Sequence, residues 1–242
     1  MFSYYKNIRE ASKQILLTCP AMFIGHYAVG LASTRLAPRT PLPWLVAAPL
    51  FLDLLWPIFL LTGVESVRIA PGYTRVTPLD LHDYPWSHSL AAGVVWSLVL
   101  AAVYLALPRH RADRRGALVL GLGVFSHWIL DWMTHAPDMP LWPGSKHLVG
   151  LGLWNSLPGT LLVEGSMFVA AVVLYARGTR PVGRAGVVSF WSLVAFLSIM
   201  YVSAIFGPLP PSERVLAWMA LLSWILVPWA AWIERTRQRV AP

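Results

Sequence analysis

The chain has 242 residues, of which 57% are hydrophobic and 12% are charged, and its formal net charge is +8. Soluble domains carry roughly 25% charged residues, so this composition excludes an ordinary soluble protein and indicates an all-α polytopic membrane protein. A basic excess in such a protein usually lies in cytoplasmic loops, and we expect no nucleic-acid partner. The single Cys19 excludes an internal disulfide and a Cys-rich zinc site, so histidines and carboxylates would have to hold any metal.

Residues 1–14 form a basic, partly amphipathic lead-in of the kind that lies on a membrane surface. Apolar stretches follow, each near the roughly 20 residues needed to cross a bilayer. The sequence therefore predicts one integral membrane domain over residues 1–242, with six or seven transmembrane helices in one bundle. Pro57 and Pro228 lie inside two of these stretches and should kink them. The expected spans are 15–37, 43–62, 88–107, 116–134, 157–177, 185–206 and 215–233.

Arginine clusters follow the first, third, fifth and seventh of these spans, so they lie on one side of the membrane. The positive-inside rule makes that side cytoplasmic, and it places the connections 63–87, 135–156 and 207–214 outside. Seven full spans would put Lys6, Arg9 and Lys13 outside as well. Either the first segment is re-entrant, or its basic lead-in is an exception to the rule.

Three side chains that can bind a metal lie at the end of the fourth span: His127, Asp131 and His135. Residues four apart lie on one face of a helix, so all three should point the same way. Ionisable groups at membrane depth cost free energy and mark functional sites. On the predicted topology four more groups reach the same depth, in the outer half of the bilayer. They are His26, Asp53, His88 and Glu164.

These residues predict a metal site whose core is formed by residues 15–177, with 185–233 as two additional spans. The 135–156 connection, rich in proline, tryptophan and leucine, should fold as a lid over the site. Three further polar residues are candidates to hydrogen-bond the metal ligands and so orient them: Asp83, Asp138 and Asn155. Imidazole and carboxylate together suit zinc or a similar divalent ion, and one or two such ions would activate water against a phosphoester. Asp53 could be a general base or a ligand.

Two alternatives remain open from the residues alone. The buried acids and histidines could form an ion or proton relay in a transporter. A metal could also hold the helices together without catalysis. The chain contains neither an H-E-x-x-H sequence nor a G-x-S-x-G sequence, so nothing predicts a zinc protease of that type or a serine hydrolase elbow.

The residues also carry a family resemblance over about 22–165. Gly25-His26, the Asp53 helix, Ser87-His88-Ser89-Leu90, and Ser126-His127-x-x-x-Asp131 followed by Pro140-Leu141-Trp142-Pro143 resemble the YdjM-like family. Its members are bacterial inner-membrane proteins described, by inference, as metal-dependent hydrolases, and they are grouped with zinc phospholipase C and P1-type nucleases. The resemblance implies an inner-membrane hydrolase whose site faces the extracytoplasmic side and whose substrate is a phosphoester, either a membrane phospholipid or a lipid-linked phosphate.

The resemblance further implies a ligand order that the chain supplies as His26, Asp53 as base, His88, His127, Asp131, His135 and Glu164. The chain departs from the family pattern at two positions. Asp83 stands where many members have the first His of H-R-G-x-T-H-S, and Thr160 stands where zinc phospholipases have the His of an H-x-x-x-E pair. The number of metal ions, one or two, therefore stays open.

Overall fold

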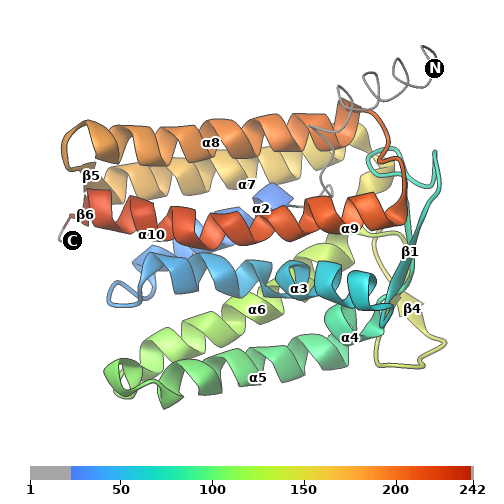
Figure 1. The fold of residues 1–242 in the computed structure, drawn as a ribbon, viewed down its shortest axis with the longest axis horizontal. Helices are drawn as coiled ribbons and strands as arrows, with labels where there is room; N and C mark the ends of the chain where they lie inside the picture. Colours follow the sequence, from blue (N-terminus) through green and yellow to red (C-terminus); the bar gives the residue numbers. More distant parts are fainter. Residues whose placement is uncertain (1–22, 241–242) are drawn as a thin grey trace, which may run out of the picture.

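The structure is a computed structural model that describes residues 23–240. The predicted lead-in at 1–14 and the first part of the 15–37 segment lie outside the described residues. The long helices run side by side, with two hairpins at one end and the C-terminal strand at the other (Figure 1). The helices of the bundle are α2 Phe23–Ala32, α3 Leu42–Thr62, α5 Leu90–Ala106, α6 Arg114–Thr134, α7 Leu157–Gly178, α8 Gly183–Phe206, α9 Glu213–Leu221 and α10 Leu226–Thr236.

Within the described residues, five helical segments are long and apolar enough to cross a membrane. They are Leu42–Thr62, Arg114–Thr134, Leu157–Gly178, Gly183–Phe206 and Glu213–Thr236. The apolar helix α5 is shorter, because a separate turn, α4 Pro85–His88, ends at His88 and the Ser89 side chain then caps α5 by accepting from Ala92 N. The helical membrane class is thus as predicted. The described residues contain five spans and one shorter apolar helix, so the expected count of six or seven is not confirmed.

Three short antiparallel strand pairs correct the all-α prediction within residues 23–240. They are β1 Ser66–Ile69 with β2 Leu79–Asp83, β3 Met139–Pro140 with β4 Leu148–Val149, and β5 Thr179–Pro181 with β6 Arg237–Arg239. In the first hairpin Val67, Leu79 and Leu81 are buried, whereas Arg68 and His82, which directly follow Val67 and Leu81, are exposed. This alternation is typical of a strand with one covered face. The hairpin therefore lies over the end of the bundle with its apolar face inward.

Two glycines bring the site-bearing helices into close contact. A Cβ on Gly30 of α2 would lie 2.9 Å from both Leu45 O and Val46 Cα of α3. A Cβ on Gly123 of α6 would lie 3.1 Å from Ala48 Cβ. Gly30 and Gly123 each lie one helical turn from a candidate ligand, on the same helix face. Small residues at these helix crossings therefore bring together the candidate metal ligands on α2, α3 and α6.

Prolines shape two spans in different ways. Helix α3 continues through Pro49 and Pro57, although neither residue can donate the usual backbone hydrogen bond. In the last span, the 3-10 turn η4 Leu222–Ile225 separates α9 from α10 just before Pro228. The last span is therefore irregular just before Pro228, whereas α3 stays one helix through Pro57; the predicted kinks themselves stay predictions.

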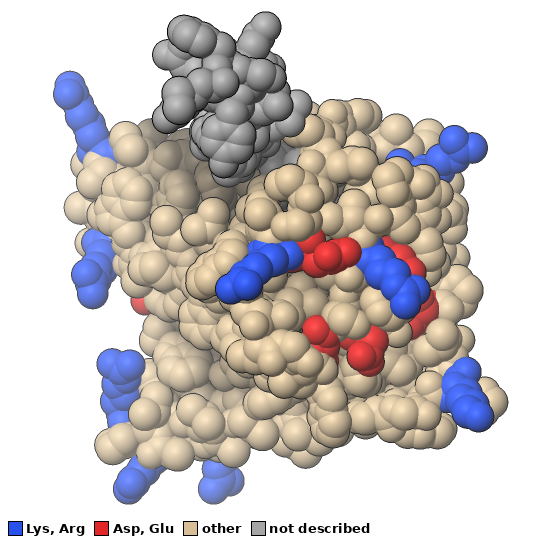
Figure 2. All heavy atoms as spheres, turned by 45° about the vertical axis from the view of Figure 1, so that its right-hand side comes forward, with Lys and Arg blue, Asp and Glu red and all other residues tan. Residues whose placement is uncertain are grey.

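The two kinds of surface agree with a membrane-embedded bundle. Large apolar side chains are exposed along the sides of the helices, among them Leu98, Leu118, Leu122, Leu162 and Leu222. Acidic and basic side chains gather instead around a hollow at the hairpin end, as Figure 2 shows. Lipid can solvate the apolar sides, whereas the charged end needs water.

Candidate metal centre

Asp131 of α6 lies at the centre of a cluster of imidazoles. Its Oδ2 is 3.0 Å from His127 Nε2 and 3.7 Å from His88 Nε2. Its Oδ1 is 3.1 Å from His26 Nε2 and 3.9 Å from His135 Nε2. Asp131 itself is only 2% exposed. His127 and Asp131 of α6 thus face the same point as His26 and His88, which come from α2 and α4. His135 is the residue just after the end of α6, where the backbone is already extended, and it reaches the cluster from there.

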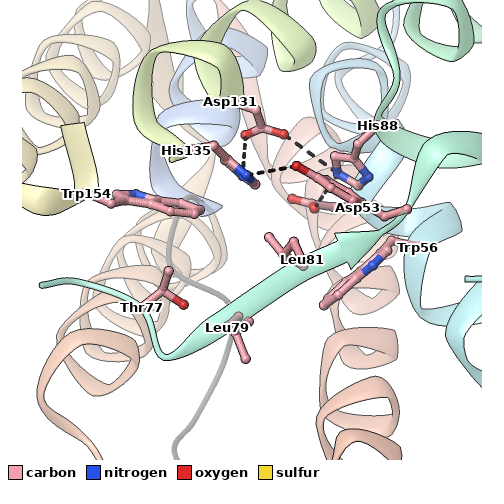
Figure 3. A pocket seen from close by; sticks show the side chains of 10 residues that line it. Asp53, Trp56, Thr77, Leu79, Leu81, His88, Asp131, His135 and Trp154 are labelled. Atoms are coloured by element: carbon pink, nitrogen blue, oxygen red, sulfur yellow. Dashed lines mark hydrogen bonds and ion pairs between the residues drawn. The ribbon is translucent and has the colours of Figure 1, made fainter. Parts of the chain in front are cut away.

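Asp53 of α3 adds a second carboxylate. Its Oδ1 is 3.6 Å from His88 Nε2 and 3.8 Å from His127 Nε2. The Asp53 side chain is 22% exposed, whereas that of Asp131 is 3% exposed. Figure 3 shows Asp53, His88 and Asp131 along the wall of one cavity. Asp53 is therefore the more accessible of the two carboxylates to a molecule in the cavity.

The partners of the two central histidines fix where their protons lie. His127 Nδ1 is 2.7 Å from the carbonyl oxygen of Pro49, and a carbonyl can only accept, so Nδ1 carries the hydrogen. His88 Nδ1 is 2.6 Å from Ser87 Oγ, whose own hydrogen is donated to Glu65 Oε2 at 2.7 Å. Both rings therefore direct an unprotonated Nε2 into the cluster when they are neutral.

These two Nε2 atoms are 3.2 Å apart. Two nitrogen lone pairs at that distance, with two carboxylates beside them, repel one another unless a cation or an added proton lies among them. The donor set of imidazoles and carboxylates is one that zinc uses.

The distances also fit a tetrahedral ion. Bonds of about 2.0–2.1 Å in tetrahedral geometry separate the ligand atoms by roughly 3.3 Å. The five distances given above among His88 Nε2, His127 Nε2, Asp131 Oδ2 and Asp53 Oδ1 range from 3.0 to 3.8 Å. Among residues 23–240, two overlapping groups have all their ligand atoms within 4.8 Å of one another. They are His26–His127–Asp131 and Asp53–His88–His127.

His26 and His135 flank this core. The His26 ring stacks on that of His127, with centroids 3.8 Å apart, and among the described residues its Nδ1 has no hydrogen-bond partner. His135 Nδ1 lies 3.1 Å from Asp138 Oδ1, which leaves its Nε2 facing Asp131. Both imidazoles are thus within reach of the site, and their role as ligands stays a prediction.

Glu164 lies apart from both groups. It is fully buried in α7, and its Oε1 accepts a hydrogen bond of 3.4 Å from Trp154 Nε1. The Trp154 ring lies 4.3 Å from the His135 ring, so the indole stands between Glu164 and the cluster. The predicted ligand role of Glu164 therefore has no direct contact to support it.

The three candidates for orienting groups have different positions. Asp138 is buried and accepts from Tyr84 Oη at 2.9 Å while it contacts His135. Burial, reinforced by the Asp138 carboxylate, raises the pKa of Tyr84, so this phenol keeps the proton that it donates. Asp83 and Asn155 are exposed at the surface, and in the described part of the chain neither bonds to a candidate ligand. Of the three, Asp138 is therefore the one that contacts a candidate ligand, His135.

A cavity with an empty volume of about 410 Å³ opens beside the cluster. Asp53, His88, Asp131 and His135 form its polar wall. Leu79 and Leu81 of β2 cover it from the hairpin, as Figure 3 shows, and Trp56, Tyr84 and Trp154 complete the lining. Of the 135–156 connection, His135 and Trp154 of η3 Leu153–Asn155 line the cavity, whereas β3 and β4 do not, and the β1–β2 hairpin covers the rest.

Sequence reasoning missed the groups that hold the ligands. Glu65 and Ser87 support His88, and a backbone carbonyl, that of Pro49, supports His127. Glu65 could have been noticed as a lone acid three residues beyond the end of α3, with Val64 and Val67 on either side of it. A backbone acceptor leaves no signal in the residue types.

One comparison with known proteins gives a match. The family model described as YdjM inner membrane protein matches residues 21–207, which is most of the chain and includes every candidate ligand from His26 to Glu164. No curated protein and no solved structure matches. The segment beyond residue 207, with α9 and α10, lies outside the matched region. The chain therefore belongs to the YdjM inner membrane protein family.

Proposed function

We propose that this protein is a membrane-embedded, metal-dependent hydrolase that acts on a phosphoester. The observation that carries the proposal is the pair of Nε2 atoms of His88 and His127, which face each other at 3.2 Å between two carboxylates beside the cavity. A bound zinc-type ion would polarise a phosphoryl oxygen and make water a nucleophile at neutral pH. His88, His127 and Asp131 would hold one ion, and His26 and His135 would hold it or a second one.

Asp53 would act as the general base. Its carboxylate is the more exposed of the two and lines the cavity, so it can reach a water molecule beside a bound substrate. Hydrolysis forms a P–O bond from that water and breaks the P–O bond to the leaving alcohol. Asp53 takes the proton that the water loses, and the alcohol oxygen gains a proton as it leaves. Asp53 could serve as a ligand as well.

The apolar half of the cavity favours a lipid-like substrate. A second cavity, with an empty volume of about 440 Å³, lies next to the first and shares Thr77 and Leu79 with it. Its other lining residues come mainly from the end of α8, including Ile205, and from the connection between α8 and α9, including Pro208 and Leu209. An aliphatic chain could lie along these surfaces while its phosphoryl group meets the cluster. A phospholipid or a lipid-linked phosphate fits this arrangement.

The proposed site faces the extracytoplasmic side of the inner membrane. The connection between α5 and α6 carries Arg109, Arg111, Arg114 and Arg115, and it lies at the end of the bundle opposite the hairpins (Figure 1). The positive-inside rule assigns that arginine-rich end to the cytoplasm. The hairpin end, where the site lies, would then be outside.

The test measures turnover and bound metal in the same purified samples. Wild type, Asp53→Asn and His127→Ala would be compared in detergent micelles that contain zinc and either a phospholipid or a lipid-linked monophosphate. We expect wild type to hydrolyse the substrate, the turnover rate of Asp53→Asn to be about 10²–10⁴-fold lower, and His127→Ala to lose its bound metal. His147→Ala, which removes an exposed histidine, is the matched control and should behave as wild type.

The same samples separate the two alternatives. Metal bound at the site without turnover of any lipid phosphoester would indicate a structural metal. A wild-type protein that binds no metal would instead favour an ion or proton relay through Asp53, Asp131 and Glu164.

A further inference from the structure

Glu65 is a buried acid that the proposed hydrolysis does not use. It lies in the short link between α3 and β1, and it is 3% exposed. Its Oε1 accepts from the backbone N–H groups of Trp86 and Ser87, at 2.8 and 2.7 Å. Its Oε2 accepts from Ser87 Oγ at 2.7 Å. All three donors belong to α4, the short helical turn that ends in His88.

The hydroxyl of Ser87 connects this carboxylate to His88. A serine hydroxyl has one hydrogen, and here Glu65 receives it. The oxygen of Ser87 is then left as an acceptor for His88 Nδ1–H, 2.6 Å away. Burial raises the pKa of Glu65, although the three hydrogen bonds that its carboxylate accepts act to lower it. The carboxylate thus sets the direction of two successive hydrogen bonds.

We propose that Glu65 is a positioning residue of the metal centre, which acts through Ser87 to hold His88 in the tautomer that presents Nε2 to the ion. This inference rests on the metal site of the proposed function. It concerns metal affinity rather than the hydrolytic step.

A comparison of the two central histidines explains why the acid is needed at His88. The partner of His127 is the Pro49 carbonyl, which can only accept, so that tautomer is fixed by the backbone. The partner of His88 is a hydroxyl, which can either accept from Nδ1 or donate to it. If Ser87 donated, the hydrogen of His88 would move to Nε2 and block the ligand position. Glu65 prevents this by taking the serine hydrogen.

Helix capping alone does not account for the arrangement. The two backbone N–H groups of α4 both bind Oε1, so one oxygen would suffice for a cap. The bond from Ser87 Oγ to Oε2 is additional, and it is the one that continues to His88.

Glu65→Gln is a sharp test, because it keeps the shape and reverses the hydrogen bonds. The Gln amide oxygen can replace Oε1 as acceptor for the backbone, which directs the amide NH₂ at Ser87. Ser87 then accepts from that NH₂, and its hydrogen turns toward His88 Nδ1 at 2.6 Å, which is closer than its other acceptor, the Tyr84 carbonyl oxygen at 3.5 Å. We expect zinc affinity to fall by about 10–100-fold, as for other groups that orient metal ligands. Asp83→Asn, which changes an exposed acid at the end of β2 that bonds to no candidate ligand among the described residues, is the matched control and should leave the affinity unchanged.

The Ser87→Ala background separates the relay from a general loss of structure. Without the hydroxyl, Glu65 has no route to His88, so Glu65→Gln should add little to the effect of Ser87→Ala on zinc affinity. Equal zinc affinity in Glu65→Gln and Asp83→Asn would overturn the proposal. So would a Glu65→Gln effect of the same size with and without Ser87.

The tautomer itself can be observed without metal. Nitrogen-15 NMR of the metal-free protein, with the His88 signal assigned by His88→Gln, distinguishes a protonated Nδ1 from a protonated Nε2. We expect Nδ1–H in wild type and a shift toward Nε2–H in Glu65→Gln; the same tautomer in both would overturn the proposal. If wild type binds no zinc, the proposed function fails, and this measurement still decides whether Glu65 controls His88.

Discussion

Replacing Asp131 by Asn tests the metal centre at its most connected residue. The two carboxylate oxygens of Asp131 lie 3.0–3.7 Å from the Nε2 atoms of His26, His88 and His127. Asn keeps the shape, removes the negative charge, and replaces one oxygen with an NH₂ group that cannot bind a metal. We expect the affinity for zinc to fall by about two orders of magnitude, since a charged ligand is lost.

The stability change follows from linkage between binding and folding. At a free zinc concentration of about 100 times Kd, binding stabilises the folded wild type by about 2.7 kcal/mol. A change of 1 kcal/mol shifts the melting temperature of a chain of this size by about 2–4 °C, so a chelator should lower that of wild type by about 5–11 °C. With an affinity about 100-fold weaker, the same zinc concentration stabilises Asp131→Asn by only about 0.4 kcal/mol. Its shift on chelation should therefore be about 1–2 °C.

The assay is thermal melting of both proteins in one detergent, with and without chelator, together with the metal content per chain. His147→Ala, a change far out in an exposed loop, should respond to chelator as wild type does. The reasoning is refuted if wild type holds no metal, does not respond to chelator, and melts no higher than Asp131→Asn. That result would fit a buried relay instead, because Asn then removes a buried charge at no cost.

Three further predictions concern the scaffold. Gly30→Ala should lose about 1–3 kcal/mol of stability, because its Cβ meets backbone atoms at 2.9 Å, whereas Gly165→Ala, which meets nothing within 4 Å, should melt no lower than wild type. In intact cells that express a variant without Cys19, an impermeant thiol reagent should label a cysteine introduced at position 145 and not one introduced at 112. The reverse result would place the site on the cytoplasmic side. Asp113→Ala should cost about 1 kcal/mol at neutral pH, measured by melting, because Asp113 caps α6. Burial acts to raise the pKa of Asp113, but hydrogen bonds to its carboxylate hold it below the usual value, so this difference should disappear as pH falls through that pKa.

The sequence predicted the parts of the site that depend on periodicity and burial cost. Residues four apart on α6 must share a face, and an acid or histidine in an apolar segment must find a partner. His127 and Asp131 accordingly meet His26 and His88 in the structure. Apolar runs also predicted the five membrane-length segments to within a few residues, since a bilayer requires roughly 20 consecutive apolar residues.

The connections could not be predicted in the same way. The β1–β2 hairpin depends on Val67, Leu79 and Leu81 finding a covered face at the end of the bundle, and that face exists only in the folded protein. Glu164 fits the family order of ligands, yet Trp154 fills the space between it and the cluster. Order along the chain fixes neither the rotation of a helix nor the side chains that lie between two residues.

Metal affinity and helix packing should therefore depend on the same contacts. Gly30 and Gly123 set how closely α2 and α6 approach α3, and each lies one turn from a ligand. A Cβ at Gly30 moves α2 away, so it should weaken zinc binding through His26 as well as lower stability. By linkage, zinc favours the closely packed arrangement by as much as that packing favours zinc. Saturating zinc should then raise the melting temperature of Gly30→Ala, and it should raise it less when His26→Ala is added. An equal rise in both would place His26 outside the metal centre and leave its stacking on His127 as a packing contact.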